Sequence, residues 1–487
     1  MNKPLRRASV FSLLLVLVLV AWVTYVQVAE GASFRDNSHN ERNTISQYAN
    51  PLGNIMAGGR PITGSTATTG DLKYKRTYPD GKLYAPVTGY SSQSYGSNQL
   101  EALNRSVLDG SDTRLKNPLE ALTREPSKPG DVLTTIDPAV QKAAFEGLGN
   151  KTGAAVALDP ETGKVLALAS TPSYDPGTFA GSGTADQKAW LKLTKDKDQP
   201  MLNRALRQTY PPGSAFKLVV AAAALEDGLY SSVDEPTRSP DPYRLPGTVT
   251  DMKNENASAP CENATIRTAL QYSCNTVFAK LAVDLGQSKL RAEAKKLGFG
   301  DSELDIPVRA AKSVYPSGMD DAQTALTGMG QFDVTATPLQ MAMVSSAIAN
   351  DGKLMKPHEV DRTTDGSATT LDRTEPETYS QAMSKSTAKE LRSAMRTVVQ
   401  KGTGTNAKIP GVEVGGKTGT AQHGEDNSGN PFAWFVSYAD DGSGHKIAVA
   451  VVVEDSDAPR ADISGGGLAG PIAKSMMSAA LEGGAAS

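Results

Sequence analysis

Ser214 and Lys217 stand three residues apart in the segment YPPGSAFKL, residues 210–218. On a helix, residues at this spacing share one face, so the lysine amine can reach the serine hydroxyl. A serine hydroxyl is a weak nucleophile at neutral pH and needs a neighbouring base before it attacks an acyl group. The pair therefore predicts chemistry through an acyl-serine intermediate. The alternative is that Ser214 merely caps a helix.

The segment that follows predicts a buried helix. Residues 218–225 are apolar on all sides and the run stops at Gly228, as expected of a core helix with a glycine after its end. Pro211, Pro212 and Gly213 place Ser214 near the first turn. Free backbone N–H groups and the positive end of the helix dipole favour developing negative charge there.

A second motif comprises Ser273 and Asn275, which follow a segment predicted to be helical at residues 265–272. Serine and asparagine are ordinary loop residues, so a capping role is the alternative. Beside Ser214 they gain a chemical role. A second hydroxyl can pass a proton to a leaving amine, and a carboxamide can hold a substrate amide.

A third motif comprises Lys417, Thr418, Gly419 and Thr420 in the segment VEVGGKTGTA, residues 412–421. Valines alternate with small or polar residues there, which predicts an edge strand. Its glycines allow another backbone to approach, so an extended peptide can dock by strand addition. The lysine and the two threonine hydroxyls then suit a terminal carboxylate. The alternative is a purely structural glycine-rich strand.

Two other interpretations use the same region. Residues 411–418 match the phosphate-loop pattern, but a loop with several glycines follows them where a nucleotide site needs a helix. His423 is an alternative base for Ser214, less favoured than Lys217 because only the lysine has one-turn spacing. The four histidines are far apart in the sequence and form no ligand motif, so no metal and no cofactor is expected.

The N-terminus predicts a membrane anchor. Basic residues at positions 3, 6 and 7 precede an almost unbroken apolar run at residues 10–28, close to the roughly 20 residues that span a bilayer. The charge difference across this run predicts a cytoplasmic segment at residues 1–9 and an extracytoplasmic remainder. A cleaved signal peptide is the alternative, because small residues follow the run.

Composition excludes some functions and leaves one question open. The 487 residues are 39% hydrophobic, with a formal net charge of -3 and no basic clusters, whereas nucleic-acid-binding proteins need a positive face. Cys261 and Cys274 are the two cysteines. In an exported chain they can pair and brace the second motif, but two free thiols fit the sequence equally well.

The chain divides by pattern into two extracytoplasmic parts. Residues 29–130 predict an irregular, β-rich domain and a linker, and residues 131–487 a second domain. In the second domain, short apolar runs at residues 154–158, 165–169, 433–438 and 446–453 predict an antiparallel sheet. Helical segments lie between them, one with a capping box at Thr387 and Glu390 and an end at Gly402. This order predicts an α+β fold with the Ser214 helix against the sheet.

The order Ser-x-x-Lys, Ser-x-Asn, Lys-Thr-Gly resembles that of penicillin-binding proteins and serine β-lactamases. With the stretches VLTTID (132–137), ALDPETGKVLA (157–167) and TPLQMA (337–342), nearly the whole chain resembles a class B penicillin-binding protein. Residues 78–90, YPDGKLYAPVTGY, are similar to the penicillin-binding protein A branch of actinobacteria. The implied fold is a transpeptidase domain preceded by a dimerisation or pedestal-like domain and one transmembrane helix.

The resemblance implies a peptidoglycan D,D-transpeptidase of cell-wall biogenesis, acting in cell shape or division and inhibited by β-lactams. Ser214 is then the nucleophile and Lys217 its base. Ser273 and Asn275 relay protons and position the peptide, while Lys417, Thr418, Gly419 and Thr420 bind the substrate carboxylate. Expected partners are stem peptides ending in D-Ala-D-Ala, β-lactams, the membrane and wall-synthesis membrane proteins.

Three other functions use the same fold: a D,D-carboxypeptidase, a β-lactamase, and a non-catalytic scaffold that senses wall fragments or β-lactams. Cys274 stands where the related motif of class A β-lactamases has aspartate, which favours a penicillin-binding protein. The sequence leaves open the role in elongation, division or sporulation, the acceptor and the oligomeric state.

Overall fold

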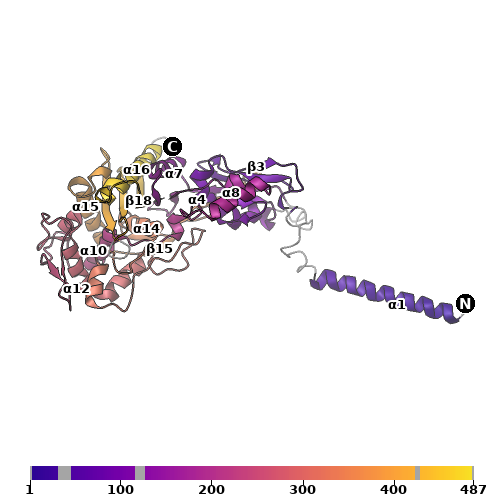
Figure 1. Ribbon diagram of the computed structural model, residues 1–487, viewed down its shortest axis with the longest axis horizontal. Coiled ribbons are helices and arrows are strands. Elements are labelled where there is room, and N and C mark those ends of the chain that lie inside the picture. Colours follow the sequence, from indigo (N-terminus) through magenta and orange to yellow (C-terminus); the bar gives the residue numbers. More distant parts are fainter. Residues whose placement is uncertain (1–2, 31–44, 46, 116–126, 423–427, 485–487) are drawn as a thin grey trace.

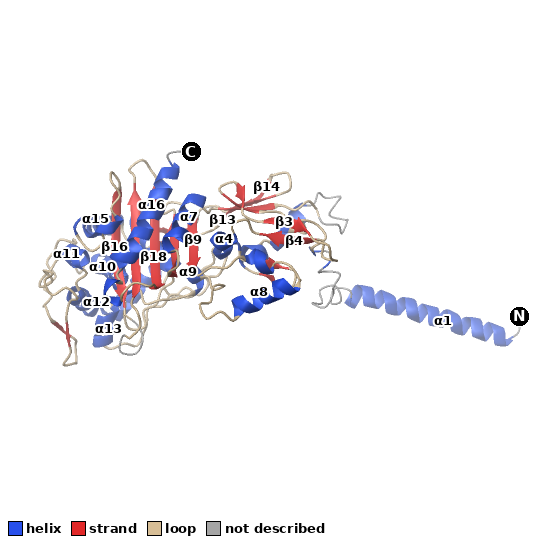
Figure 2. Ribbon diagram, turned by 45° about the horizontal axis from the view of Figure 1, so that its top comes forward, coloured by secondary structure: helices blue, strands red, loops and turns tan. Residues whose placement is uncertain are grey.

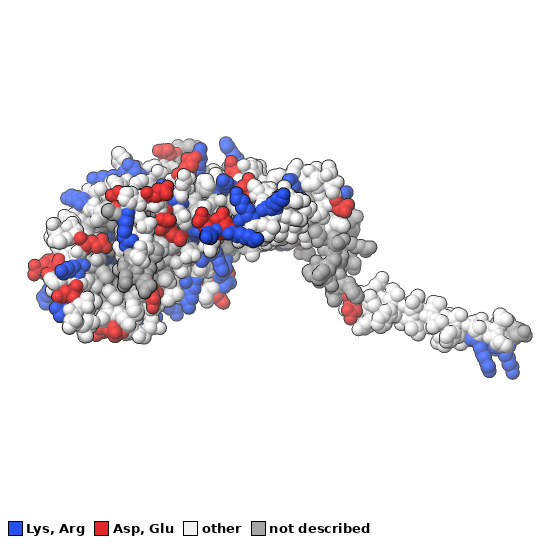
Figure 3. Space-filling model, in the orientation of Figure 1, with Lys and Arg blue, Asp and Glu red and all other residues white. Residues whose placement is uncertain are grey.

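The computed structural model describes residues 3–30, 45, 47–115, 127–422 and 428–484. Its first element is the exposed helix α1 (Lys3–Tyr25), continued by a π-helical turn at Val26–Glu30. This helix stands apart from the globular part, and its only charged side chains are the basic ones at its start (Figure 1, Figure 3). It is long and apolar enough to cross a membrane.

A five-stranded sheet organises the second domain, in the order β16-β17-β18-β8-β9. All its pairings are antiparallel, which confirms the prediction, and β16 is an edge strand, as expected. The strands are β8 (Thr152–Leu158), β9 (Val165–Thr171), β16 (Glu413–Ala421), β17 (Phe432–Asp440) and β18 (Lys446–Asp455).

Helices cover both faces of this sheet (Figure 2). On one face α7 (Pro138–Leu148) and α16 (Gly470–Gly484) pack together over the strands. On the other face α14 (Pro338–Ala349) and α15 (Lys385–Lys401) contact each other and pack over the strands. The seven residues Ile447–Val453 of β18 are all apolar because both sides of that strand are buried. The predicted α+β architecture is confirmed.

The helix after Ser214 is α10 (Lys217–Glu226), and eight of its ten residues are buried, from Lys217 to Ala224. It packs on α12 (Asn275–Lys296) and α15. The short 3-10 turn before it, Gly213–Phe216, is the part that contacts strands β16 and β17. The sequence-based prediction of the helix against the sheet is therefore corrected: the turn meets the sheet, and the helix body lies among other helices.

The predicted capping box at Thr387 and Glu390 is wrong. Helix α15 begins three residues earlier than predicted, because its N-cap is Ser384, whose hydroxyl accepts a hydrogen bond from the Thr387 backbone N–H at 3.1 Å. Glu390 instead accepts hydrogen bonds from Ser232 and Val233. The error arose because Ser384 and Thr387, three residues apart near the start of this helix, both carry a hydroxyl group that can cap a helix. The predicted end at Gly402 is confirmed.

The N-terminal part is β-rich, as predicted, with a second five-stranded sheet in the order β14-β13-β7-β1-β2. Two of its strands, β13 (Val360–Thr364) and β14 (Thr370–Arg373), come from late in the chain. The other strands of this part are β1 (Ile55–Ala57), β2 (Arg60–Pro61), β3 (Gly64–Ala67), β4 (Tyr74–Thr77), β5 (Ser91–Ser92), β6 (Gly96–Ser97) and β7 (Asp131–Thr134). Its helices α4 (Gly81–Thr88), α5 (Gln99–Leu103) and α6 (Arg105–Leu108) are short.

An aromatic cluster attaches helix α8 (Thr184–Thr194) to this N-terminal part. The indole ring of Trp190 stacks on Tyr95 with centroids 4.3 Å apart, and it meets Tyr90 edge-on at 5.5 Å. Figure 1 shows α8 beside α4, where Ala85 belongs to the same apolar cluster as Trp190. Segments from both sides of residue 130 therefore share one packed unit.

The buried carboxyl group of Glu359 gives a first test of the fold. Neither of its oxygens has a hydrogen-bond partner among the described residues, and burial raises its pKa well above the ordinary 4.5. The unfolded chain releases this proton at a pH near 4 to 5, so folding loses stability as pH rises from there toward the raised pKa.

The variant Glu359→Gln cannot ionise. Its melting temperature is expected to match the parent at pH 4 and to exceed it at pH 7.5 by a few degrees, since 1 kcal/mol corresponds to roughly 2–4 °C in domains of 150–250 residues. Calorimetry at both pH values measures this, with the exposed Glu375→Gln as control. An equal difference at both pH values contradicts the account.

Candidate active site

Ser214 lies in the 3-10 turn Gly213–Phe216, directly before α10. Its side chain is half-buried, and no hydrogen bond of its hydroxyl is found within the described chain. The N-cap positions of the turn and of α10 are Pro212 and Phe216. The interpretation of Ser214 as a capping residue is therefore wrong, and its hydroxyl is free to react.

Backbone contacts fix this turn against the edge of the sheet. Gly213 has φ +53°, and a Cβ on it would lie 3.0 Å from the Ala421 Cβ. Its N–H donates to the Gly330 carbonyl at 3.1 Å, while the Pro211 carbonyl accepts from the indole N–H of Trp434 at 3.0 Å. Glycine is thus required where the nucleophile turn touches strand β16.

Lys217 is completely buried one turn after Ser214. Its Nζ donates to Asn275 Oδ1 at 2.7 Å, to the Ser273 carbonyl at 2.8 Å and to Ser273 Oγ at 3.2 Å. The described hydrogen bonds of this amine thus go to the second motif and none goes to Ser214. The spacing of the first motif is as predicted, but it is the second motif that anchors the lysine.

Lys417, on the edge strand β16, is also completely buried. Its Nζ donates to Ser273 Oγ at 3.0 Å and to the Thr418 carbonyl at 2.8 Å. The Ser273 hydroxyl therefore lies between the two lysine amines. One oxygen joins the three motifs, which are separated by more than fifty residues in the sequence.

Burial controls the electrostatics of this pair. Desolvation lowers the pKa of Lys217 well below the ordinary 10.5, and the nearby charge of Lys417 lowers it further. Desolvation also lowers the pKa of Lys417 to about 7, while the charge of Glu255 acts in the opposite direction on both lysines. The neutral amine that a general base requires is therefore available on Lys217 at a lower pH than on an ordinary lysine.

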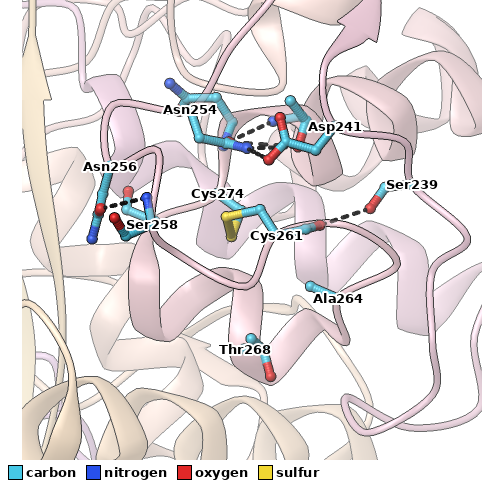
Figure 4. Close-up of a disulfide and its surroundings, with 12 residues drawn as sticks. Ser239, Asp241, Asn254, Asn256, Ser258, Cys261, Ala264, Thr268 and Cys274 are labelled. Atoms are coloured by element: carbon cyan, nitrogen blue, oxygen red, sulfur yellow. Dashed lines mark hydrogen bonds between the residues drawn. A yellow bond between two sulfur atoms is a disulfide. The ribbon is translucent and has the colours of Figure 1, made fainter.

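Ser273 owes its position to a left-handed backbone. It ends helix α11 (Ile266–Tyr272) with φ 60°, and Asn275 begins α12 two residues later. The next residue, Cys274, forms a disulfide with Cys261 (Figure 4). The structure thus decides between the two cysteine states that the sequence left open, and the bridge holds the second motif to the preceding loop.

Asn254 is a positioning residue that sequence reasoning missed. Its Oδ1 accepts hydrogen bonds from the backbone N–H groups of Asn275 at 2.6 Å and Thr276 at 3.1 Å, and its Nδ2 donates to Asp241 at 2.8 Å (Figure 4). The carboxamide thereby caps α12 from a distant loop. No local pattern signals this contact, because the two segments lie 21 residues apart.

The remaining residues of the third motif line the same strand. The Thr418 hydroxyl is hydrogen-bonded to the Thr403 hydroxyl at 2.7 Å. Thr403, like Asn254, is a residue of the site that the sequence did not indicate. A Cβ on Gly419 would lie 2.9 Å from the Pro212 carbonyl, so this glycine permits the close approach of strand and nucleophile turn. Thr420 follows, half-buried, on the same strand.

The alternatives for this region fare differently. Residues Glu413–Ala421 form one continuous strand, whereas a phosphate loop must be a loop that opens a helix. The nucleotide interpretation is therefore wrong. His423 lies outside the described residues, so the interpretation of it as a base is untested.

The assembled groups suit acyl transfer. An accessible serine lies one turn before a buried lysine of lowered pKa, and a second hydroxyl lies between that lysine and another. The glycine-rich edge strand runs beside the serine. A carbonyl bound along that strand would meet the nucleophile, a base and hydrogen-bond donors together.

Family models match most of the chain. Residues 153–478 match the penicillin binding protein transpeptidase domain, and residues 52–132 match the penicillin binding protein A dimerisation domain. The peptidoglycan D,D-transpeptidase PbpA of Mycolicibacterium smegmatis is 38% identical over 99% of both chains. Its namesake from Mycobacterium tuberculosis is 36% identical over 99% of this chain and 100% of its own.

Solved structures agree. Penicillin-binding protein A from Mycobacterium tuberculosis as a ceftriaxone acyl-enzyme complex superposes with a TM-score of 0.84, at 36% identity, over 90% of this chain and 100% of its own. The penicillin G acyl-enzyme complex of the same protein gives a TM-score of 0.81, at 36% identity, over 88% of this chain and 99% of its own.

The disulfide generates a prediction about the second motif. The double variant Cys261→Ser/Cys274→Ser is expected to lose about 3 kcal/mol of stability, because a bridge closing a loop of this length restricts the unfolded chain by about that amount. A melting temperature lower by several degrees, read by calorimetry, checks this. Thiol alkylation of the unreduced parent protein, followed by mass analysis, is the control. An unchanged melting temperature, or two alkylated cysteines in the parent, contradicts the assignment.

Proposed function

The chain belongs to the penicillin-binding protein transpeptidase family, and on this premise we propose that it is a serine-type peptidoglycan D,D-transpeptidase. It cross-links stem peptides through an acyl-serine intermediate and is inhibited by β-lactams. One observation carries this proposal beyond family membership. The Ser273 hydroxyl accepts hydrogen bonds from both buried lysines, at 3.2 and 3.0 Å, while the Ser214 hydroxyl has no hydrogen bond within the described residues.

In the proposed acylation step, Ser214 Oγ attacks the carbonyl carbon of the penultimate D-alanine. The neutral amine of Lys217 takes the hydroxyl proton, and that proton passes by way of Ser273 to the nitrogen of the departing D-alanine. The hydrogen bonds from Lys217 to Ser273 and Asn275 support this direction of transfer. An amine from a second stem peptide then attacks the ester and releases the enzyme.

The proposed oxyanion hole consists of the backbone N–H groups of Ser214 and Thr420. The contact between the nucleophile turn and strand β16 supports it, because both donors belong to these packed segments. Such donors contribute about 3 to 4 kcal/mol each to acyl transfer. We assign Lys417, Thr418, Gly419 and Thr420 to the carboxylate of the peptide, which docks along the strand edge.

The N-terminal helix makes the chain a single-pass membrane protein of this family. We propose a cytoplasmic segment at residues 1–9, a span at 10–28, a dimerisation or pedestal-like domain at 29–130 and the transpeptidase domain at 131–487, from which β7, β13, β14 and α8 pack into the N-terminal part. The basic side chains before the span support this orientation. Wall-synthesis membrane proteins are the partners proposed for the anchor and the N-terminal domain.

Acylation by a labelled penicillin tests the nucleophile. Intact-mass analysis is expected to show one penicilloyl adduct that persists for many minutes, located on Ser214 by peptide mapping. The variant Ser214→Ala, checked for folding by its melting temperature, is expected to show none. Rapid loss of the adduct would make the protein a β-lactamase. A folded parent without adduct would leave only the scaffold function.

A second prediction concerns pH. The second-order rate constant of acylation is expected to rise as Lys217 loses its proton, well below pH 10.5, and to fall as Lys417 loses its charge near pH 7. In Lys417→Met the positive neighbour is gone, so the pKa of Lys217 rises and the rising limb moves to higher pH. Rate measurements from pH 5 to 10 check both. A rising limb that does not move in the variant contradicts the coupling.

A further inference from the structure

A large cavity lies beyond the C-terminal end of helix α12, outside the three motifs. Its volume is about 840 Å³, within the range of small-molecule sites. The lining residues come from the end of α12, from the loop after it and from strand β15 (Thr378–Gln381). None of them belongs to the catalytic groups described above.

The charges around this cavity are unbalanced. Four cationic side chains line it, those of Arg291, Lys295, Lys296 and Lys312, against the single carboxylate of Asp301. Lys296 is paired with the buried Glu293 at 2.9 Å. The other three cations form no ion pair with any described residue, and Arg291 donates only to neutral oxygens. The cavity therefore attracts an anion.

The inner wall is aromatic and touches the nucleophile segment. Phe299 and Tyr315 line the cavity and are buried to 3% and 7% exposure. Both pack on Phe216, with ring centroids 5.5 Å and 5.8 Å away. Phe216 lies between Ser214 and Lys217 in the sequence. A ligand pressed against this wall is thus one aromatic layer from the catalytic turn.

We propose that this cavity is a second binding site, for a short peptide with free carboxylates, and that its occupancy alters the reactivity of Ser214 through Phe216. The lysines bind the carboxylates, and the aromatic wall contacts the apolar part of the peptide. Asp301 and the Pro316 carbonyl also line the cavity and already accept hydrogen bonds from Tyr379 and Arg291. Each oxygen keeps a second lone pair for an N–H group, which a peptide has and a simple phosphate lacks. The inference rests on the proposed function, because uncross-linked stem peptides supply such carboxylates at the site of synthesis.

Binding is tested by titration calorimetry of the full-length chain in detergent at low ionic strength. The probes are acetyl-Ala-Glu-Ala with free carboxylates, its uncharged form acetyl-Ala-Gln-Ala-amide, and phenyl phosphate. Each is titrated into the free enzyme and into enzyme first acylated with penicillin, so that the catalytic site is filled. If the acidic peptide still binds after the enzyme has been acylated, the second site is supported. Loss of binding on acylation, or binding of phenyl phosphate alone, overturns it.

Matched variants locate the binding. Lys295→Ala/Lys312→Ala is expected to lower the affinity for the acidic peptide by about tenfold, since each lysine contributes somewhat under 1 kcal/mol to binding. Lys188→Ala/Lys192→Ala removes two equally exposed charges from helix α8 and is expected to leave the affinity unchanged. Equal weakening in both variants indicates unspecific attraction and overturns the proposal.

Coupling is read from the acylation rate. At saturating acidic peptide, the penicillin acylation rate constant of the parent is expected to change by about fivefold, a common size for linked sites. The rate of Lys295→Ala/Lys312→Ala is expected not to respond at the same concentration. An unchanged rate in the parent overturns the coupling. If penicillin does not acylate Ser214 at all, the proposed function fails, while the titrations on the free enzyme still report the cavity.

Discussion

The site depends on the burial of two lysines that form no ion pair with a carboxylate among the described residues. Lys217 and Lys417 are both completely enclosed, and their described hydrogen bonds go to serine, threonine and asparagine oxygens. An ammonium group loses much hydration free energy on burial, so the neutral amine is favoured. A carboxylate in the same place would have restored the charge of Lys217 and removed its value as a base.

The surrounding fold serves this constraint. Both faces of the central sheet are covered by helices, and β16 is one of its two edge strands, so a peptide can add there. Glycines at positions 213 and 419 let the nucleophile turn approach that strand closely. The disulfide at Cys274 and the carboxamide of Asn254 hold the second motif from outside. The catalytic oxygens are thus fixed by separate covalent, polar and steric contacts.

The sequence indicated these groups because each motif is local. The apolar helix after Ser214, the alternation around Lys417 and the turn residues between strands follow directly from side-chain chemistry, and each was found where predicted. Thr403 and Asn254 were missed because their partners, Thr418 and Asn275, are distant in the sequence. The position of α10 was also mispredicted, because tertiary packing decides whether a buried helix lies against a sheet or against other helices. The start of α15 was missed for a local reason, because either of two nearby hydroxyl residues was a plausible cap.

The direct test of this account is a titration of the two lysine side chains by NMR. Lysine labelled with ¹³C at Cε, in the full-length chain in detergent, reports each amine through its chemical shift, with Lys217→Met and Lys417→Met for assignment. The account predicts that both resonances titrate far below the ordinary lysine value of 10.5, Lys417 at about 7. Ordinary titration of Lys217 near 10.5 would contradict its role as the base.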